Sequence, residues 1–251
     1  MRRLWTVLLL LLTATVAAGA GYVVTAHDSV PRAGQTPGIR LATDPSLPGA
    51  TPSGSRSSGD PSNSAAAPAP GVAFLGDDYT AGVGASSARN GWTARLARAL
   101  RVHATTAAQP GAGYAARGID GGSYQSLVGQ VVAAHPGVVI VSGGRNDVAD
   151  DPATLHSAAR TLFADLHEKL PEARLVAVAP FWGDSAHPPK LTKVDVAVRA
   201  GVQAAGGTYL DTADPLTGHP EWMADAADPN DRGYAAIATA LAAELRTSVP
   251  R

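Results

Sequence analysis

The sequence predicts an α/β fold in which helices cover both faces of a parallel sheet of about five strands. From residue 71 onward, short apolar runs bounded by Gly, Pro or Asp alternate five times with longer stretches of helical periodicity. Gly, Asp and Asn residues gather directly after the first three of these runs. Strands that alternate with helices pair in parallel, so these polar residues are expected at the edge of the sheet where ligands bind.

The elements follow in order along the chain. Strands are predicted at 72–75, 102–106, 138–142, 175–179 and 208–210, and helices at 92–100, 124–134, 153–170, 190–204 and 231–245. Asp151 is a suitable N-cap for the third helix, with Pro152 at its first position, and the last helix begins at Pro229 or Asn230. The alternation indicates one globular domain over residues 71–251.

Composition excludes several classes of function. The 251 residues carry a net charge of −1, which argues against a nucleic-acid partner because no basic surface is available to replace phosphate counterions. The chain has no cysteine, so disulfides, thiolate metal sites and a cysteine nucleophile are excluded. We expect no cofactor, and we expect a monomer.

The first 26 residues indicate export. Arg2 and Arg3 precede an apolar run from Leu4 to about Ala26, which is typical of a signal peptide and also long enough for an uncleaved signal anchor. The two arginines favour the cytoplasmic side. The remainder is therefore expected to be secreted or anchored to the outer face of the cytoplasmic membrane, with the N-terminal segment as the only membrane contact.

Residues 27–70 have the composition of a disordered linker. They hold 8 Pro, 5 Gly and 8 Ser among 44 positions, with few large apolar side chains. Such a stretch buries too little surface to offset its ordering entropy. A tether between a membrane segment and a domain suits a protein that reaches into the cell envelope.

Three motifs lie at the expected ligand-binding edge. GDDYTAG begins at Gly76, GRND begins at Gly144, and DAADPN begins at Asp225. In order and spacing they resemble the blocks Gly-Asp-Ser, Gly-x-Asn-Asp and Asp-x-x-His of the SGNH/GDSL hydrolase family of esterases and lipases. The resemblance covers the whole globular part and implies a three-layer, flavodoxin-like α/β/α fold.

The resemblance implies an unusual reacting pair. Asp78 stands where the family has its nucleophilic serine, and Asp228 stands where it has its histidine base. Asp225 then corresponds to the residue that orients the base. The family's oxyanion hole maps onto the Asp78 amide, Asn146 and Gly113, with Gly111 as the second choice of glycine.

Three functions remain open for such a site. A carboxylate pair is the arrangement that glycosidases use, which favours hydrolysis of envelope polysaccharide or acylated glycan by Asp78 and Asp228. An inactive family member that binds carbohydrate or a protein partner is the second possibility. Residual acyl-ester hydrolysis is the third, since donors such as Asn146 still polarise a carbonyl. Attack by Asp78 on an ester would give an anhydride, which disfavours the third.

Other residues are candidates for substrate binding. Arg145 lies inside the third-strand motif, Trp182 offers a face for a sugar ring, and His219 offers an imidazole in place of the missing base. Ser185 and His187 form a second, literal Gly-Asp-Ser motif, but it follows the fourth strand rather than the first. The acidic residues have no dedicated calcium-loop spacing, so no metal site is predicted.

Overall fold

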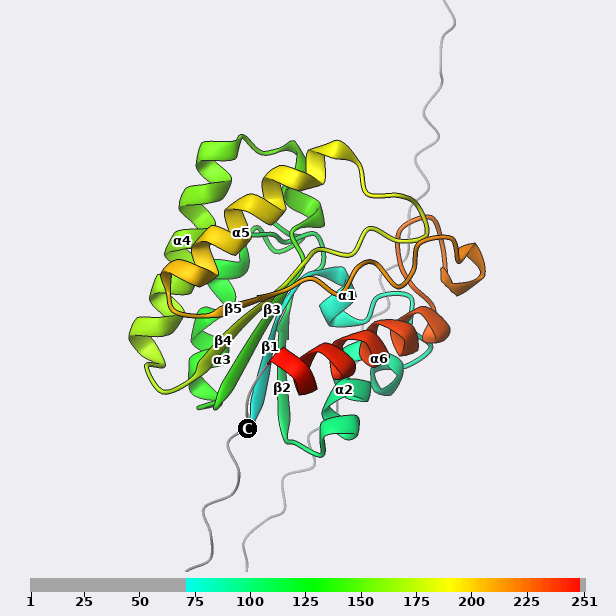
Figure 1. Cartoon of the computed structure of the whole chain (residues 1–251), viewed down its shortest axis with the longest axis horizontal. Helices are drawn as coiled ribbons and strands as arrows, with labels where there is room; N and C mark the ends of the chain where they lie inside the picture. Colours follow the sequence, from blue (N-terminus) through cyan, green and yellow to red (C-terminus); the bar gives the residue numbers. More distant parts are fainter. Residues whose placement is uncertain (1–70, 249–251) are drawn as a thin grey trace, which may run out of the picture. The chain divides into compact units, whose positions relative to one another are not determined.

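A computed structural model describes residues 71–248 (Figure 1). The expected signal segment at 1–26 and linker at 27–70 lie outside the described residues. Within the part that the structure describes, no helix combines the length and apolar character needed to cross a membrane.

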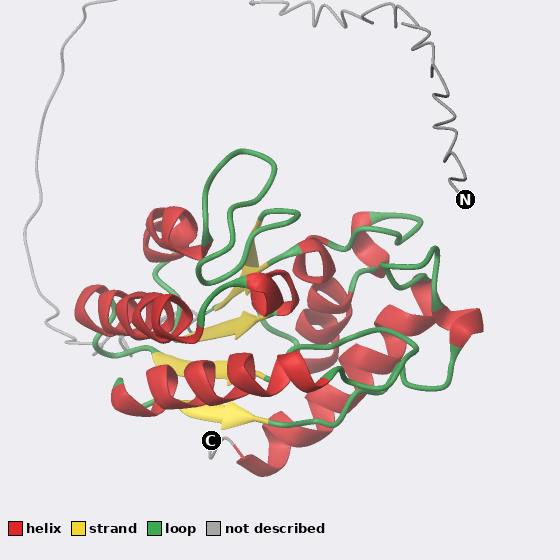
Figure 2. Cartoon of the chain, turned by 90° about the horizontal axis from the view of Figure 1, so that it is seen from above, coloured by secondary structure: helices red, strands yellow, loops and turns green. Residues whose placement is uncertain are grey.

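The centre of the domain is a five-stranded sheet, and every neighbouring pair in it is parallel. The strand order is β2-β1-β3-β4-β5. In chain order the strands are β1 (Val72–Gly76), β2 (Ala104–Ala108), β3 (Val138–Ser142), β4 (Arg174–Val178) and β5 (Thr208–Leu210). The predicted three-layer α/β fold is confirmed, because helices lie on both sides of this sheet (Figure 2).

Alternating side chains of the strands separate the two cores. Leu75 and Val141 face the helices α3 (Val128–Ala133), α4 (Pro152–Lys169) and α5 (Thr192–Ala204). Phe74 and Ile140 pack with α2 (Trp92–Leu100) and α6 (Asp231–Ser248). These two helices lie on the other side of the sheet from α4 and α5 (Figure 1). Successive residues of a strand point to opposite faces of the sheet. A strand that is buried on both faces is therefore apolar along its whole length, as β1 and β3 nearly are.

The largest differences from the predicted elements are at β2 and at the helix expected at 124–134. Strand β2 begins two residues later than expected, because Arg101 adopts a left-handed conformation that ends α2 and the Val102 amide still donates to Ala97. The expected helix at 124–134 is a 3₁₀ helix, Tyr124–Leu127, followed by the short α3. The cap that Asp151 forms for α4 is confirmed, since its side chain accepts from Ala153 and Thr154.

The carboxyl end of β1 is packed too tightly for any side chain. A Cβ atom on Gly76 would lie 2.2 Å from the Thr80 hydroxyl and 2.3 Å from the Ser142 carbonyl oxygen. Glycine here lets the one-turn helix α1 (Asp78–Ala81) sit directly against the end of β3. The motifs that follow β1 and β3 are thereby brought together.

Candidate active site

Asp77 holds the start of α1. Its carboxylate accepts the amide of Tyr79 at 3.2 Å, and the residue is 2% exposed. Burial raises the pKa of Asp77 to about 7, while the nearby Arg145 opposes the rise. Gly143, directly after β3, leaves space for this carboxylate, because a Cβ on Gly143 would lie 2.6 Å from Asp77 Oδ2. Asp77 therefore acts as a buried cap, a role that its position in the motif did not indicate.

Asp78 is bound by two hydrogen-bond donors at the carboxyl edge of the sheet. Its Oδ2 atom accepts the backbone amide of Gly111 at 2.9 Å and the Nδ2 atom of Asn146 at 3.2 Å. The Asn146 amide is itself oriented by the Ala112 carbonyl, at 2.8 Å. We call the Gly111 amide and Asn146 Nδ2 the donor cradle. The motifs that follow β1, β2 and β3 thus converge, and the side chain of Asp78 occupies the point of convergence.

The choice of Gly113 as the donating glycine is corrected by this geometry. The Gly113 amide donates to the Ala116 carbonyl at 3.0 Å, within its own loop, and Gly111 faces Asp78 instead. Gly113 is needed for another reason, because a Cβ there would lie 2.3 Å from the carboxylate of Asp147. The sequence marked both glycines but could not show which amide points toward the site.

Asp147 braces the loop that carries the donating glycine. Its carboxylate accepts the amides of Tyr114 at 2.9 Å and of Ala115 and Ala116 at 2.8 Å. Asp147 is fully buried, and this burial raises its pKa while the three amides oppose the rise. The residue was visible in the Gly-x-Asn-Asp motif but was not predicted to have a role. Its neighbour Asn146 reaches the site because Asp147 is fixed in this way.

Asp228 lies in the site beside Arg145. The Nη2 atom of Arg145 is 3.6 Å from Asp228 Oδ1, and their side chains are 17% and 11% exposed. That oxygen is buried and has no hydrogen-bond partner. Burial raises the pKa of Asp228, opposed by Arg145, with Asp78 and Asp225 adding to the rise. Asp78 is therefore close enough to contribute to the raised pKa of Asp228.

Arg145 is not a solvated arginine at the mouth of the site. Its guanidinium lies 4.5 Å from the centre of the Tyr79 ring and donates to the Tyr79 hydroxyl at 3.1 Å and to the Ala227 carbonyl. With the ion pair to Asp228, these contacts join α1 to the loop before α6. The binding of substrate by Arg145 stays a prediction, and it would require a group that competes with these partners.

Asp225 orients the backbone of the base-bearing loop. Its Oδ1 atom accepts the amides of Ala227 and Asp228, both at 2.8 Å, and these bonds lower its pKa. The predicted orienting role is thus exerted on the main chain of Asp228 rather than on its carboxylate.

The loop that carries Trp182 and the second Gly-Asp-Ser motif approaches Tyr79 at Gly183, where an added Cβ would lie 3.5 Å from the Tyr79 hydroxyl. The Trp182 amide donates to Asp214, and its side chain is half-buried against the core. His187 Nε2 lies 3.2 Å from the same Asp214 carboxylate, whereas the Ser185 hydroxyl donates to Asp184. Ser185 and His187 are therefore engaged with different carboxylates and do not form a dyad in this structure.

His219 is held by its own loop. Its ring stacks on Trp222 with centroids 3.6 Å apart, and Nδ1 lies 3.0 Å from Glu221 Oε1. Among the described residues it has no contact with Asp78 or Asp228, so the structure does not bring it to the place of the missing base. Residues 71–248 also contain no group of three or more histidine or acidic side chains arranged to hold a metal ion.

The site therefore combines an oxyanion-type donor pair with carboxylates. Backbone and amide N–H groups of this kind stabilise developing negative charge in acyl transfer. Among the described residues, the hydrogen-bond partner that the two cradle donors share is the carboxylate of Asp78 and not a serine or cysteine side chain. The donors of the cradle thus bind a carboxylate of the protein itself.

Comparisons with known proteins agree with this architecture. The model of the GDSL-like lipase/acylhydrolase family matches residues 74–236. A GDSL lipase of Mycobacterium tuberculosis is 31% identical over 186 residues, which are 68% of this chain and 79% of the lipase.

Solved structures share the fold. A family two carbohydrate esterase from Clostridium thermocellum, an active-site mutant in complex with a cellulose hexasaccharide, superposes with a TM-score of 0.59 at 17% identity, over 73% of this chain and 65% of that one. A family two carbohydrate esterase from Cellvibrio japonicus gives 0.60 at 20% identity, over 72% and 61%. This chain thus spans less than two thirds of the length of these two esterases. The match of the family model and the related lipase place the chain in the GDSL-like lipase/acylhydrolase family, the SGNH hydrolases.

Proposed function

We propose that this protein is an exported SGNH family member that binds acylated glycan of the cell envelope and has lost serine-based ester hydrolysis. One observation carries the proposal: Asp78 Oδ2 accepts both donors of the cradle, Gly111 N and Asn146 Nδ2. These are the donors that would stabilise the oxyanion of a substrate. The protein's own carboxylate is in their place.

An ester would have to displace this carboxylate before it could react. Hydrogen bonds to a charged acceptor contribute about 1.5–3 kcal/mol each, more than those to a neutral carbonyl oxygen. A substrate carbonyl therefore competes poorly for the cradle. If Asp78 nevertheless attacked the acyl carbon, the product would be an anhydride. Both arguments disfavour an acyl-enzyme route.

The second reacting position also lacks the properties of an imidazole base. Arg145 faces Asp228 and opposes the rise in its pKa that burial causes. A carboxylate paired with a guanidinium is a weak base. The pocket therefore keeps the hydrogen-bond donors Gly111 N and Asn146 Nδ2, which can bind a ligand. It lacks the serine nucleophile and histidine base that ester hydrolysis uses.

The choice of ligand rests on the surroundings of the site and on the relatives. Trp182 is half-buried on the loop that approaches Tyr79 at Gly183, and it offers an aromatic face of the kind on which sugar rings pack. Two structures with the same fold are described as carbohydrate esterases, and one of them holds an oligosaccharide. The basic residues and apolar run at 1–26 support a location outside the cytoplasm.

A carboxylate hydrolase is the second candidate, and one observation favours it. Burial raises the pKa of Asp228, and Asp78 adds to the rise, which is the property that the acid catalyst of a glycosidase requires. This reaction would require Asp78 to leave the cradle or to act while bound to it. Aryl glycoside turnover lost in both Asp78→Ala and Asp228→Ala would establish it in place of the binding protein.

The experiment that tests the proposal restores the missing chemistry. Aryl acetate hydrolysis is measured for the wild type, for Asp78→Ser/Asp228→His, and for the same double variant with Asn146→Ala. We expect no turnover by the wild type, measurable turnover by the double variant, and a loss of about 100-fold when Asn146 is removed. Binding of acetylated xylan oligosaccharides to the wild type is measured in parallel. Ester turnover by the wild type that survives Asp78→Ala would contradict the proposal.

A further inference from the structure

One buried carboxylate, that of Asp214, joins the loops that follow β4 and β5. Its side chain is 2% exposed and accepts the backbone amides of Trp182 and Leu216, the second at 3.0 Å. His187 Nε2 lies 3.2 Å from the oxygen that also accepts from Trp182. Ala213, directly before Asp214, has a φ of 53°, a left-handed conformation that is unfavourable for alanine. Backbone strain of this kind is concentrated at functional positions, so the placement of this carboxylate points to a function.

The contact with Asp214 leaves His187 with one engaged and one free ring nitrogen. Nε2 donates to the ionised carboxylate, so the neutral ring carries its proton there and presents Nδ1 as an acceptor. Among residues 71–248, Nδ1 has no hydrogen-bond partner, and the side chain is 38% exposed. A carboxylate that fixes the tautomer and the orientation of an imidazole prepares the other nitrogen for contact with a ligand.

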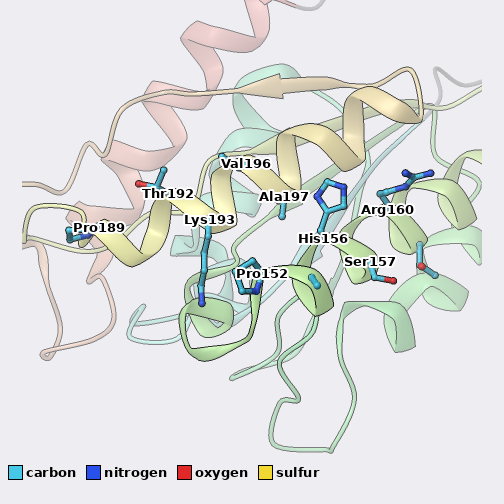
Figure 3. Close-up of a pocket in the computed structure, with 11 residues that line it drawn as sticks. Pro152, His156, Ser157, Arg160, Pro189, Thr192, Lys193, Val196 and Ala197 are labelled. Carbon is cyan, nitrogen blue, oxygen red and sulfur yellow. The ribbon is translucent and has the colours of Figure 1, made fainter.

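The other histidines of the described chain differ from His187 in this respect. His219 contacts Glu221, but these side chains are 42% and 56% exposed, so the pair does not hold the ring against a buried group. His156 lines a groove between α4 and α5 (Figure 3), and within residues 71–248 it contacts no carboxylate. His187 is therefore the histidine of the described residues that a buried carboxylate orients.

The loop that carries His187 adjoins the candidate active site at Tyr79. A Cβ on Gly183 would lie 3.5 Å from the Tyr79 hydroxyl, and this hydroxyl accepts from Arg145 at 3.1 Å. Burial raises the pKa of Tyr79, Arg145 opposes the rise, and the charge of Asp214 adds to it. The Asp214 carboxylate is thus close to the Tyr79 ring, and the pair that it forms with His187 lies on the Tyr79 side of the site.

We propose that His187 is a further ligand-contact residue of the candidate site, where its Nδ1 atom accepts a hydrogen bond from a free hydroxyl of the bound glycan, and that Asp214 is its positioning residue. The inference rests on the proposed glycan binding and adds a specificity to it. An acylated position has no hydroxyl hydrogen to donate to Nδ1. The ligand that uses His187 is therefore a partly acylated glycan that keeps at least one free hydroxyl.

Calorimetric titration of the full chain with two xylotetraoses, one partly acetylated and one acetylated at every hydroxyl, tests the contact. His187→Phe keeps a flat ring and removes both nitrogens. It should weaken binding of the partly acetylated sugar about fivefold, the effect of one lost hydrogen bond. Binding of the fully acetylated sugar should be the same in wild type and variant. His156→Phe makes the same exchange away from the site and should change either affinity less than about twofold.

Nitrogen magnetic resonance of His187 at pH 8 tests the role of Asp214. In the wild type the Nε2–H tautomer should predominate, and the partly acetylated sugar should move the Nδ1 signal upfield. Asp214→Asn should raise the share of the Nδ1–H tautomer and abolish that shift, whereas a merely structural role would leave the tautomer unchanged.

The outcomes separate this inference from the proposed function. Absence of binding by the wild type would contradict glycan binding and this inference with it. Binding of the partly acetylated sugar that is equal in wild type and His187→Phe would overturn the inference alone. His187 is exposed, so its variant gives this result even where Asp214→Asn fails to fold.

Discussion

Two carboxylates occupy the candidate active site, and the protein treats them differently. Asp78 is satisfied by a backbone amide and a side-chain amide, in hydrogen bonds of 2.9 and 3.2 Å. Asp228 keeps one buried oxygen without a hydrogen bond and faces a guanidinium at 3.6 Å. The first belongs to a preformed anion site, whereas the second is a buried charge with incomplete compensation.

The difference indicates that Asp78 contributes to the stability of the site, whereas Asp228 does not. A carboxylate that fills an anion cradle stabilises the fold, because each charge-assisted hydrogen bond contributes favourably. A buried carboxylate whose pKa is raised destabilises the folded state at neutral pH. The hydrogen bonds to Asp78 explain why the two donors of the cradle are well placed. Asp228 has no such structural explanation, and this makes it the stronger candidate for contact with a ligand.

The largest effect is expected beneath the cradle, at Asp147. Asp147→Ala leaves three amide groups without the carboxylate that accepts them, at a cost of about 1–3 kcal/mol each for buried donors. We expect a loss of about 4 kcal/mol in the free energy of unfolding, measured in urea. Asp120→Ala, at an exposed position of the following loop, is the control. A loss below about 1 kcal/mol would mean that the loop does not depend on Asp147.

The next effect concerns pH and the buried cap Asp77. Its folded pKa of about 7 lies above the ordinary 3.8, so the folded protein holds this proton more tightly than the unfolded chain. Stability from this group is therefore full below about pH 4 and is lost as pH rises to about 7, by roughly 4 kcal/mol. Asp77→Asn should remove that decline relative to the wild type in urea unfolding at pH 5 and 8. Parallel pH profiles for the two proteins would refute the raised pKa.

The two carboxylates can then be compared directly by amide substitution. Asp78→Asn weakens two charge-assisted hydrogen bonds and should cost about 2 kcal/mol in the free energy of unfolding at pH 7. Asp228→Asn removes an incompletely compensated charge, while Arg145 keeps its contacts with Tyr79 and Ala227. Its effect should lie within about 1 kcal/mol of zero or be stabilising. The reverse ranking of the two variants would invert our account of the site.

The smallest effect is expected at His219, which lies in the same loop as Asp228 but is held by Trp222 and Glu221. His219→Ala should change the free energy of unfolding by less than about 1 kcal/mol, because His219 and its ion-pair partner Glu221 are exposed. It should also leave glycan binding unchanged. A loss of binding comparable to that of an Asp228 variant would return His219 to the site.

The fold could be predicted well from the sequence, because the spacing of apolar residues reflects which faces of the strands and helices are buried. The central strands β1 and β3 are buried along almost their whole length and are continuous apolar runs, and all five strands were found within two residues of their predicted bounds. The convergence of Asp78 and Asn146 followed from their places after parallel strands. Side-chain and amide directions were not available from the sequence. Gly111 rather than Gly113 faces the site because Asp147 turns the loop, and this tertiary contact has no local signature.

Nuclear magnetic resonance of the Gly111 amide tests the central claim, the occupation of the cradle by Asp78, most directly. In the wild type at pH 7, the Gly111 amide proton and one Asn146 Nδ2 proton should be shifted downfield by the carboxylate. In Asp78→Ala both should move upfield, while the Gly113 amide, which donates to Ala116, should stay in place. If the Gly111 and Asn146 signals are the same in both proteins, Asp78 does not occupy the cradle and the account of lost ester hydrolysis is wrong.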